Sequence, residues 1–143
     1  MTALNGMRVI ELAHERVAFA GKLLADMGAD VILVEPPGGA AERHHPPFLN
    51  DAPGPDRSLW WWHYHTSKRS VEIDLGAPAG RERLLALIDQ ADVLIEAEPT
   101  RRLADLGLDW PDLATRRPTL IHAALTPFGR GNPASDLPAT DLT

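Results

Sequence analysis

The sequence has 143 residues, of which 44% are hydrophobic and 24% are charged, which indicates one globular domain with a hydrophobic core rather than a disordered chain. The formal net charge of -6 gives no electrostatic support for nucleic acid or an anionic membrane surface as a partner. The absence of cysteine excludes a disulfide, a thiolate metal site and a cysteine nucleophile.

Residues 1–35 predict a strand, a helix and a second strand. The first 12 residues have neither a basic n-region nor a long apolar run, so we expect a cytoplasmic protein. The run RVIEL at 8–12 is typical of a buried strand, and the apolar residues of 17–27 recur at helical spacing until Gly28, which ends the helix. Residues 31–35 form the second strand, which two prolines stop. Together these elements predict a right-handed βαβ unit.

The segment 36–62 shows no helical or strand periodicity. It is rich in proline, glycine and charges of both signs, which favours a loop of more than 20 residues. Such a loop is rare in a small domain unless it binds a ligand, covers a site or contacts a subunit.

Strands and helices alternate again from residue 68. This alternation, with apolar strand interiors, predicts an α/β fold: a Rossmann-like, doubly wound and mostly parallel sheet. We assign residues 1–131 to this domain and residues 132–143, where the pattern fades, to an unfinished connecting tail. The expected elements are strands at 68–75, 91–97 and 118–125 and helices at 80–89, 99–106 and 110–117.

Doubly wound sheets bind ligands beyond the carboxyl ends of their strands, so the segments after Leu12, Glu35, Ala97 and Leu125 are candidates for ligand binding. The segment after Leu12 offers His14, Glu15 and Arg16. A solvated start of the helix is the simpler explanation of these residues. No G-x-G-x-x-G motif is present, so a dinucleotide cradle is not supported.

The histidines raise the question of a metal site. His44 and His45 lie in the long loop, and His63 and His65 flank a tyrosine. No carboxylate stands at a recognisable ligand spacing, so we predict no metal. We interpret His63 and His65 as surface or packing residues on one face of a strand.

Two neighbouring features suggest a ligand or an interface. Trp60, Trp61 and Trp62 cannot all point into one core, so at least one lies at an interface, against a flat ligand, or between the loop and the sheet. In HTSKRS, Lys68 and Arg69 follow small hydroxyl residues, a combination that suits phosphate but is also common at the start of a strand.

Several blocks in order resemble the front half of the family III coenzyme A transferases, which include formyl-CoA and carnitine CoA-transferases and α-methylacyl-CoA racemases. The blocks are GMRVIEL, GKLLADMGADVILVEPPGG, TSKRSVEIDL, ADVLIE and FGRG, spread from residue 4 to residue 131. The resemblance implies a Rossmann-like domain that binds coenzyme A, in a protein whose two chains interlock. An acyl-CoA and a carboxylic acid acceptor are then the substrates, and a homodimer or a partner chain with the catalytic half is expected.

The resemblance also implies where coenzyme A binds. Three stretches match the family's nucleotide contacts: one before the strand at 68–75, one after ADVLIE, and the loop that contains Phe128. Two departures are that the usual Asn-Phe after I-E is Ala-Glu here, and that the segment after Leu12 is one residue shorter. The implied contacts are His65, Thr66, Ser67, Lys68, Ala97, Glu98, Pro99, Thr126, Pro127, Phe128 and Gly129.

The family's chemistry is nucleophilic catalysis, in which an aspartate attacks the thioester and forms a mixed anhydride. That aspartate belongs to an L-G-D segment that this sequence does not match, so we assign no catalytic residue and expect this chain alone to be inactive. The racemase histidine is also absent, because the matching positions are Ala139, Thr140 and Asp141.

Two other interpretations fit part of the sequence. One is a non-catalytic structural or regulatory module that binds coenzyme A. The other is a response-regulator or flavodoxin-like domain, although Glu11 and Leu12 stand where a phosphoacceptor aspartate would end the first strand.

Overall fold

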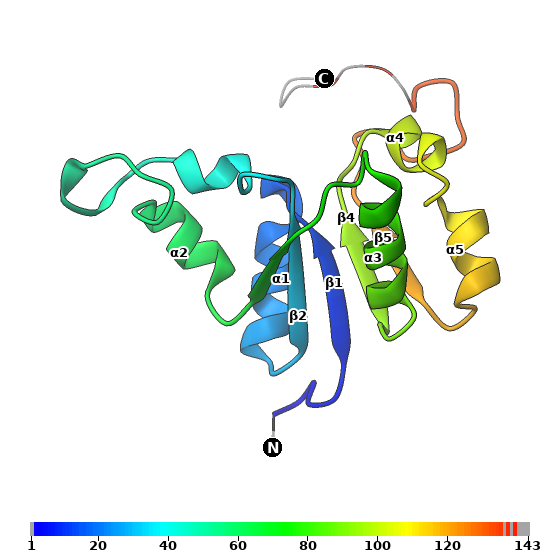
Figure 1. Ribbon diagram of the computed structural model, residues 1–143, viewed down its shortest axis with the longest axis horizontal. Helices are drawn as coiled ribbons and strands as arrows, with labels where there is room; N and C mark the ends of the chain where they lie inside the picture. The colour runs from blue at the N-terminus through cyan, green and yellow to red at the C-terminus, as the bar shows by residue number, and fades with distance from the viewer. Residues whose placement is uncertain (1, 136, 138, 140–143) are drawn as a thin grey trace.

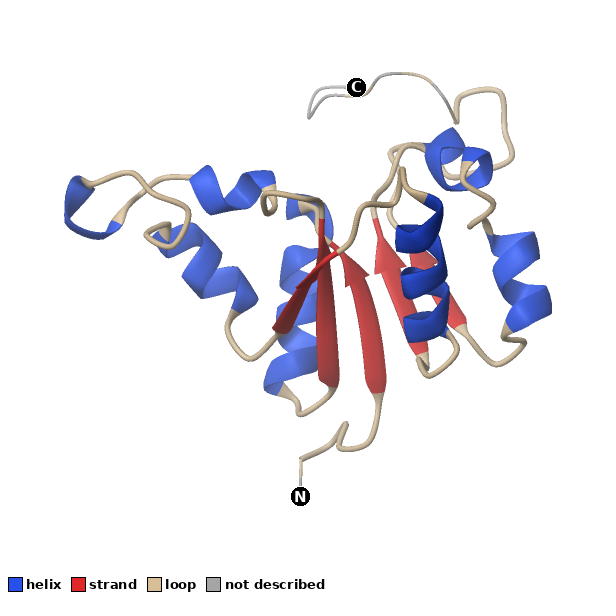
Figure 2. Ribbon diagram, viewed as in Figure 1, coloured by secondary structure: helices blue, strands red, loops and turns tan. Residues whose placement is uncertain are grey.

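The computed structural model describes residues 2–135, 137 and 139; Thr140 and Asp141, compared above with the racemase motif, lie outside the described residues. Helices lie on both faces of a five-stranded sheet (Figures 1 and 2). The strands are β1 (Arg8–Leu12), β2 (Asp30–Glu35), β3 (Arg69–Glu72), β4 (Val93–Glu96) and β5 (Ile121–Ala124). The α-helices are α1 (Glu15–Asp26), α2 (Leu59–His65), α3 (Pro78–Ile88), α4 (Thr100–Asp105) and α5 (Trp110–Arg116), and the 3-10 helices are η1 (Ala41–His44) and η2 (Leu49–Asp51).

The sheet confirms the predicted doubly wound α/β fold. Its strand order is β3-β2-β1-β4-β5, and every neighbouring pair is parallel. The chain moves from β1 outward to β3 and then returns to β4 on the other side of β1. The direction of winding therefore reverses between β1 and β4, and this is where such sheets bind ligands.

Alternate residues of the central strands supply two cores, because successive side chains of a strand point to opposite faces. Ile10, Ile32 and Leu94 pack with α3, α4 and α5 on one face. Val9, Val31 and Val93 belong to the core that includes Ala25 of α1 on the other face. Burial on both faces explains why the strands read as continuous apolar runs.

The segment 36–66 corrects two sequence predictions. It contains η1, η2 and α2 rather than an unbroken loop, and His63 and His65 lie on a helix rather than a strand. The Ser58 hydroxyl caps α2 by accepting from the Trp61 amide at 3.0 Å. The helix separates the three indoles, so that Trp61 is buried while Trp62 is 45% exposed. This segment projects from one edge of the sheet (Figure 1).

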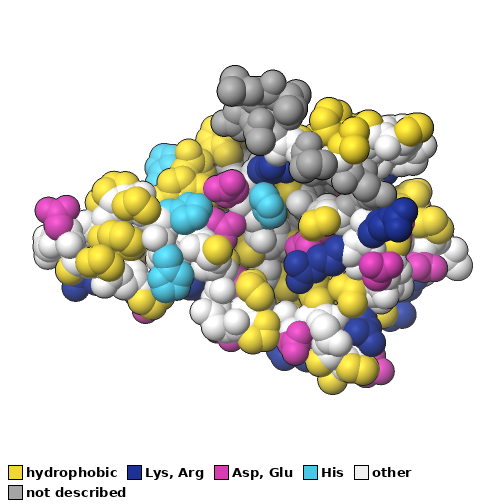
Figure 3. Space-filling model, turned by 90° about the horizontal axis from the view of Figure 1, so that it is seen from above, with side chains coloured by type: hydrophobic (Ala, Val, Ile, Leu, Met, Phe, Trp, Pro, Cys, Tyr) yellow, Lys and Arg dark blue, Asp and Glu magenta, His cyan; other side chains and the backbone are white. Residues whose placement is uncertain are grey.

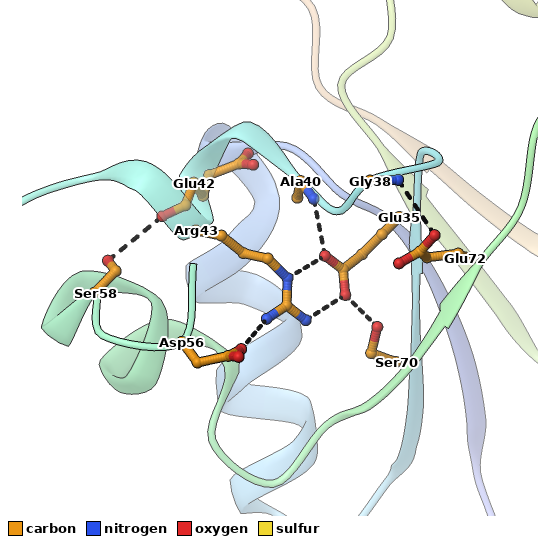
Figure 4. Close-up of polar contacts among 9 residues, drawn as sticks. All are labelled: Glu35, Gly38, Ala40, Glu42, Arg43, Asp56, Ser58, Ser70 and Glu72. Carbon is orange, nitrogen blue, oxygen red and sulfur yellow. Dashed lines mark hydrogen bonds and ion pairs between the residues drawn. The ribbon is translucent and has the colours of Figure 1, made fainter. Parts of the chain in front are cut away.

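An ion pair between Glu35 and Arg43 attaches this segment to the sheet (Figure 4). The Arg43 guanidinium donates to both carboxylate oxygens, at 2.7 and 2.8 Å, and stacks 4.1 Å from the Trp61 ring. The Ala40 amide and the Ser70 hydroxyl also donate to the Glu35 carboxylate. Burial alone would raise the pKa of Glu35, but these donors lower it to about 2.

Candidate functional site

The candidate site is a crevice at the carboxyl ends of the strands, where the winding of the sheet reverses. Ala13 and His14 follow β1, and residues 97–99 follow β4 on the neighbouring side of the reversal point. Both segments lie at the upper edge of the sheet in Figure 1.

Two adjoining pockets occupy this edge, with volumes of about 530 and 400 Å³. His14, Glu98 and Pro99 line both. The larger pocket also has Arg16, Ala97, Arg101, Leu125, Thr126, Pro127, Ser135, Leu137 and Ala139 in its walls. The smaller is completed by Leu12, Ala13, Val34, Glu35, Pro36, Pro37, Ile73, Asp74, Leu75, Gly76 and Arg102.

His14 holds the first wall of the crevice in place. Its Nδ1 accepts a hydrogen bond from the Arg16 amide at 3.2 Å and so caps α1. Arg16 also lines the larger pocket and adds positive charge to this edge, beside the N-terminus of α1.

Glu96 fixes the opposite wall. Its buried carboxylate accepts from Arg130 at 2.6 Å and from the Glu98 amide at 2.7 Å, and lies 3.0 Å from the His122 ring. Arg130 also reaches Asp109 at 2.8 Å. These contacts hold the loop after β5 against the end of β4, which is why both segments face one pocket.

Two of the three predicted stretches meet at this crevice. Ala97, Glu98 and Pro99 line the larger pocket together with Thr126 and Pro127. The Glu98 carboxylate lies 3.2 Å from Arg102, which offsets the repulsion that a glutamate would exert on a phosphate. Phe128 and Gly129 follow Thr126 and Pro127 in the same loop, but they are not among the residues that line either pocket.

The third predicted stretch, His65, Thr66, Ser67 and Lys68, lies elsewhere. It precedes the amino end of β3, whereas the crevice is at the carboxyl ends. The Lys68 ammonium is buried, 2.8 Å from the Glu11 carboxylate and 2.9 Å from the Ala18 carbonyl oxygen. Phosphate binding by Lys68 stays a prediction, and it would require the side chain to leave Glu11.

Burial perturbs all three ionisable groups of this cluster. Desolvation raises the pKa of Glu11 to about 7, although the charge of Lys68 opposes the rise. Desolvation, with the nearby Lys68 charge, lowers the pKa of His65 to about 3. Burial also lowers the pKa of Lys68. The His65 Nδ1 atom lies 3.2 Å from Lys68 Nζ, so a neutral imidazole accepts from the ammonium.

The segment after β2 was one of those that the strand-end rule singled out in the sequence, and Glu35, Pro36 and Pro37 do line the smaller pocket. Sequence reasoning missed residues 73–76, which follow β3 and line the same pocket. The same rule applied to the end of β3 and was the signal that could have found them.

Within residues 2–135, 137 and 139, no helix is long and apolar enough to cross a membrane. In the same part of the chain, no group of three His, Asp or Glu residues is arranged to hold a metal ion.

The sequence matches the model of CoA-transferase family III over residues 4–143. It is 37% identical over 136 residues to subunit BbsE of succinyl-CoA:(R)-benzylsuccinate CoA-transferase of Thauera aromatica, covering 95% of this chain and 33% of that protein. It is 41% identical over 142 residues to succinate–glutarate CoA-transferase of Agrobacterium fabrum, covering 96% of this chain and 36% of that protein.

Solved structures agree with these matches. The crystal structure of the hypothetical protein Rv3272 of Mycobacterium tuberculosis superposes with a TM-score of 0.87 and 35% identity, over 99% of this chain and 38% of that one. The crystal structure of a CAIB/BAIF family protein of Brucella suis superposes with a TM-score of 0.85 and 35% identity, over 99% of this chain and 38% of that one. The chain spans about a third of the length of the curated relatives it matches. Match and fold together show that it belongs to CoA-transferase family III.

Proposed function

We propose that this chain is the N-terminal, CoA-binding part of a cytoplasmic acyl-CoA:carboxylate CoA-transferase. The observation that carries the proposal is the convergence of residues 97–99 with Thr126 and Pro127 on one pocket at the reversal point of the sheet. The names of the matching relatives, which are transferases of CoA between carboxylic acids, support the same activity.

The crevice suits an extended anionic thioester. Arg16 and Arg101 line the larger pocket and provide positive charge for phosphate groups. The smaller pocket adds apolar walls from Leu12, Val34 and Ile73, which suit an uncharged, partly apolar chain. We therefore assign coenzyme A to both pockets, and a contact with Lys68, whose ammonium is paired with Glu11, stays a prediction.

The proposed reaction is thioester exchange through an aspartyl mixed anhydride. An aspartate attacks the thioester carbonyl, the C–S bond breaks and CoA leaves as the thiolate. The thiolate attacks the aspartyl carbonyl of the mixed anhydride and the donor leaves as a carboxylate. The acceptor carboxylate then attacks this aspartyl thioester and releases the thiolate, which attacks the acceptor's own carbonyl, so that the acceptor leaves as its CoA thioester and the aspartate is regenerated. No residue of this sequence is assigned as that aspartate. A homodimer, or a partner chain that carries the catalytic half, is part of the proposal.

Calorimetric titration with coenzyme A and dephospho-CoA tests the binding step. Saturable heat with a folded chain supports the proposal, and no heat at millimolar ligand would sink it. A non-catalytic CoA-binding module is the second candidate, since no residue of this sequence is assigned as the catalytic aspartate. Mixing the chain with candidate partner chains and assaying thioester exchange separates the two.

A further inference from the structure

One buried carboxylate connects two walls of the larger pocket. The Glu96 side chain is buried at the end of β4, and its Oε2 atom accepts from the Glu98 amide at 2.7 Å. Its Oε1 atom accepts from the Arg130 guanidinium at 2.6 Å and lies 3.0 Å from Nε2 of His122. The first contact holds the segment after β4, and the second holds the loop after β5. Both segments line the pocket.

Arg130 bridges two acids that belong to different elements. Its Nη2 group donates to Glu96, and its Nη1 group donates to Asp109 at 2.8 Å. The Asp109 carboxylate also caps α5, because it accepts from the Trp110 amide at 2.8 Å. Seen from above, basic side chains lie next to acidic ones on the side of the molecule that carries α3, α4 and α5 (Figure 3). The guanidinium therefore connects the loop after β5 with both the end of β4 and the start of α5.

The loop after β5 depends on this connection for its position. Within residues 126–132, all of which the structure describes, Arg130 is the one side chain with a hydrogen bond to another element. The Asn132 side chain bonds within the loop. Gly129 and Gly131, on either side of Arg130, have φ angles of 76° and 75°, which glycine adopts without strain. A turn of this kind with one anchoring side chain loses its placement when the anchor is removed.

We infer that Arg130 is a positioning residue for coenzyme A. Through Glu96 and Asp109 it holds the loop after β5 against the segment after β4, and so sets the width of the larger pocket. This role rests on the proposed function, because the loop lines the proposed coenzyme A site. Arg130 itself is not among the residues that line either pocket, so it acts through the loop rather than by touching the ligand.

The bridge requires an arginine. A guanidinium is a planar fork whose N–H groups point in fixed directions, so it can donate to two separate carboxylates at once. The lysine ammonium is a compact charge on a flexible chain and does not reproduce this geometry. The Arg130→Lys chain, which keeps the charge, should therefore bind coenzyme A as weakly as Arg130→Ala.

Calorimetric titration of coenzyme A into Arg130→Ala, with and without guanidinium chloride, tests the inference. The variant should bind at least about tenfold more weakly than the wild type, the scale of a lost hydrogen bond to a charged group. Guanidinium at tens of millimolar should restore most of the affinity, because the ion can bridge Glu96 and Asp109 in place of the side chain. Sodium chloride at the same concentration should not.

The matched control is Arg117→Ala. Arg117 also attaches α5 to the sheet, but it donates to the Ala91 carbonyl oxygen, at 3.1 Å, before the start of β4 and away from the crevice. This variant should lower the urea midpoint and leave the coenzyme A affinity unchanged. The comparison separates a loss of loop position from a loss of stability.

Wild-type affinity in folded Arg130→Ala, or a loss that guanidinium does not reverse, would overturn the positioning role. Should Arg130→Ala not fold, wild-type affinity in Arg130→Lys would overturn it equally. A wild-type chain that gives no heat with coenzyme A contradicts the proposed function and this role with it. Binding by the wild type with an unaffected Arg130→Ala contradicts the role of Arg130 alone.

Discussion

The Lys68 ammonium lies 2.8 Å from the Glu11 carboxylate, and the two side chains are 1% and 0% exposed. The pair joins β1 to the segment before β3, which are 57 residues apart in the sequence. Removing one charge from such a pair leaves the other buried without a partner, which is more costly than removing both. The contact therefore makes the packing of α2 and β3 depend on Glu11.

Lys68→Met should lower the free energy of unfolding by about 3–5 kcal/mol, because it leaves the Glu11 carboxylate buried without its partner. Glu11→Leu combined with Lys68→Met should recover most of that loss, since no charge then remains buried. Urea denaturation of the two variants measures both effects. A double variant no more stable than the single one would show that packing, rather than the unpaired charge, causes the loss.

The pH dependence of stability should report His65. Because the folded state lowers its pKa from 6.5 to about 3, the unfolded chain binds the extra proton first as the pH falls. Its contribution is thus fully present above pH 6.5 and declines toward pH 3, by up to about 1.4 kcal/mol per pH unit.

Glu11 acts in the opposite direction, because its raised pKa favours the folded state below pH 4.5 and this contribution is lost as the pH rises through about 7. Comparing wild type with His65→Gln, which keeps a hydrogen-bond acceptor for Lys68, isolates the His65 effect. Equal slopes of unfolding free energy against pH for both chains would contradict the assignment of a buried neutral imidazole.

Gly21→Ala should destabilise the chain even though alanine is the better helix former. A Cβ at this position would lie 1.7 Å from a Glu11 carboxylate oxygen, so the Glu11–Lys68 pair would have to move. We expect a loss of about 1–3 kcal/mol, the usual cost of overpacking. Gly54→Ala, where the nearest atom is the flexible Arg57 chain at 3.3 Å, is the control and should be nearly neutral. Thermal unfolding of both variants checks the difference.

Most of the fold was predictable from the sequence, and α2 was not. The three central strands, β1, β2 and β4, are short apolar runs bounded by turn residues, which is a local signal. The helix LWWWHYH shows no helical spacing of apolar residues, because its three tryptophans are adjacent in the sequence. Adjacent residues point to different sides of a helix, and of the three tryptophans only Trp61 is buried. The Ser58 cap just before the run was the available signal.

The site was predictable where it followed strand ends and unpredictable where it depended on long-range pairing. Residues 97–99 lie where the general rule places ligand contacts. The Lys68 ammonium pairs with Glu11, and the local sequence KRS contains no signal that its partner lies in the first strand. A glutamate within the apolar run RVIEL was the indication that some cation must be buried with it.

Arg16→Ala should weaken coenzyme A binding by about 1–3 kcal/mol if the larger pocket holds phosphate groups. Arg16 lines that pocket, and only its backbone amide takes part in the α1 cap. The control is Arg83→Ala, an exposed arginine on α3. Calorimetric titration gives the coenzyme A affinity of both variants. Equal losses of affinity in the two would show that the effect comes from the net charge of the chain rather than from a contact of Arg16 in the crevice.

The two edge strands predict where this chain associates. The β3 edge carries Arg69 and Glu72, charges that discourage pairing with another strand, whereas β5 reads IHAA and has Ile121 61% exposed. Leu125, 48% exposed, extends the same apolar edge. Ile121→Lys should therefore reduce self-association, or binding to a partner chain, by placing a charge on this edge. Leu59→Lys, the same change at an exposed leucine of α2, should not. Sedimentation over a concentration series measures the effect, and a wild-type chain that stays monomeric at high micromolar concentration, with no partner bound, would refute the assignment of β5 as an interface.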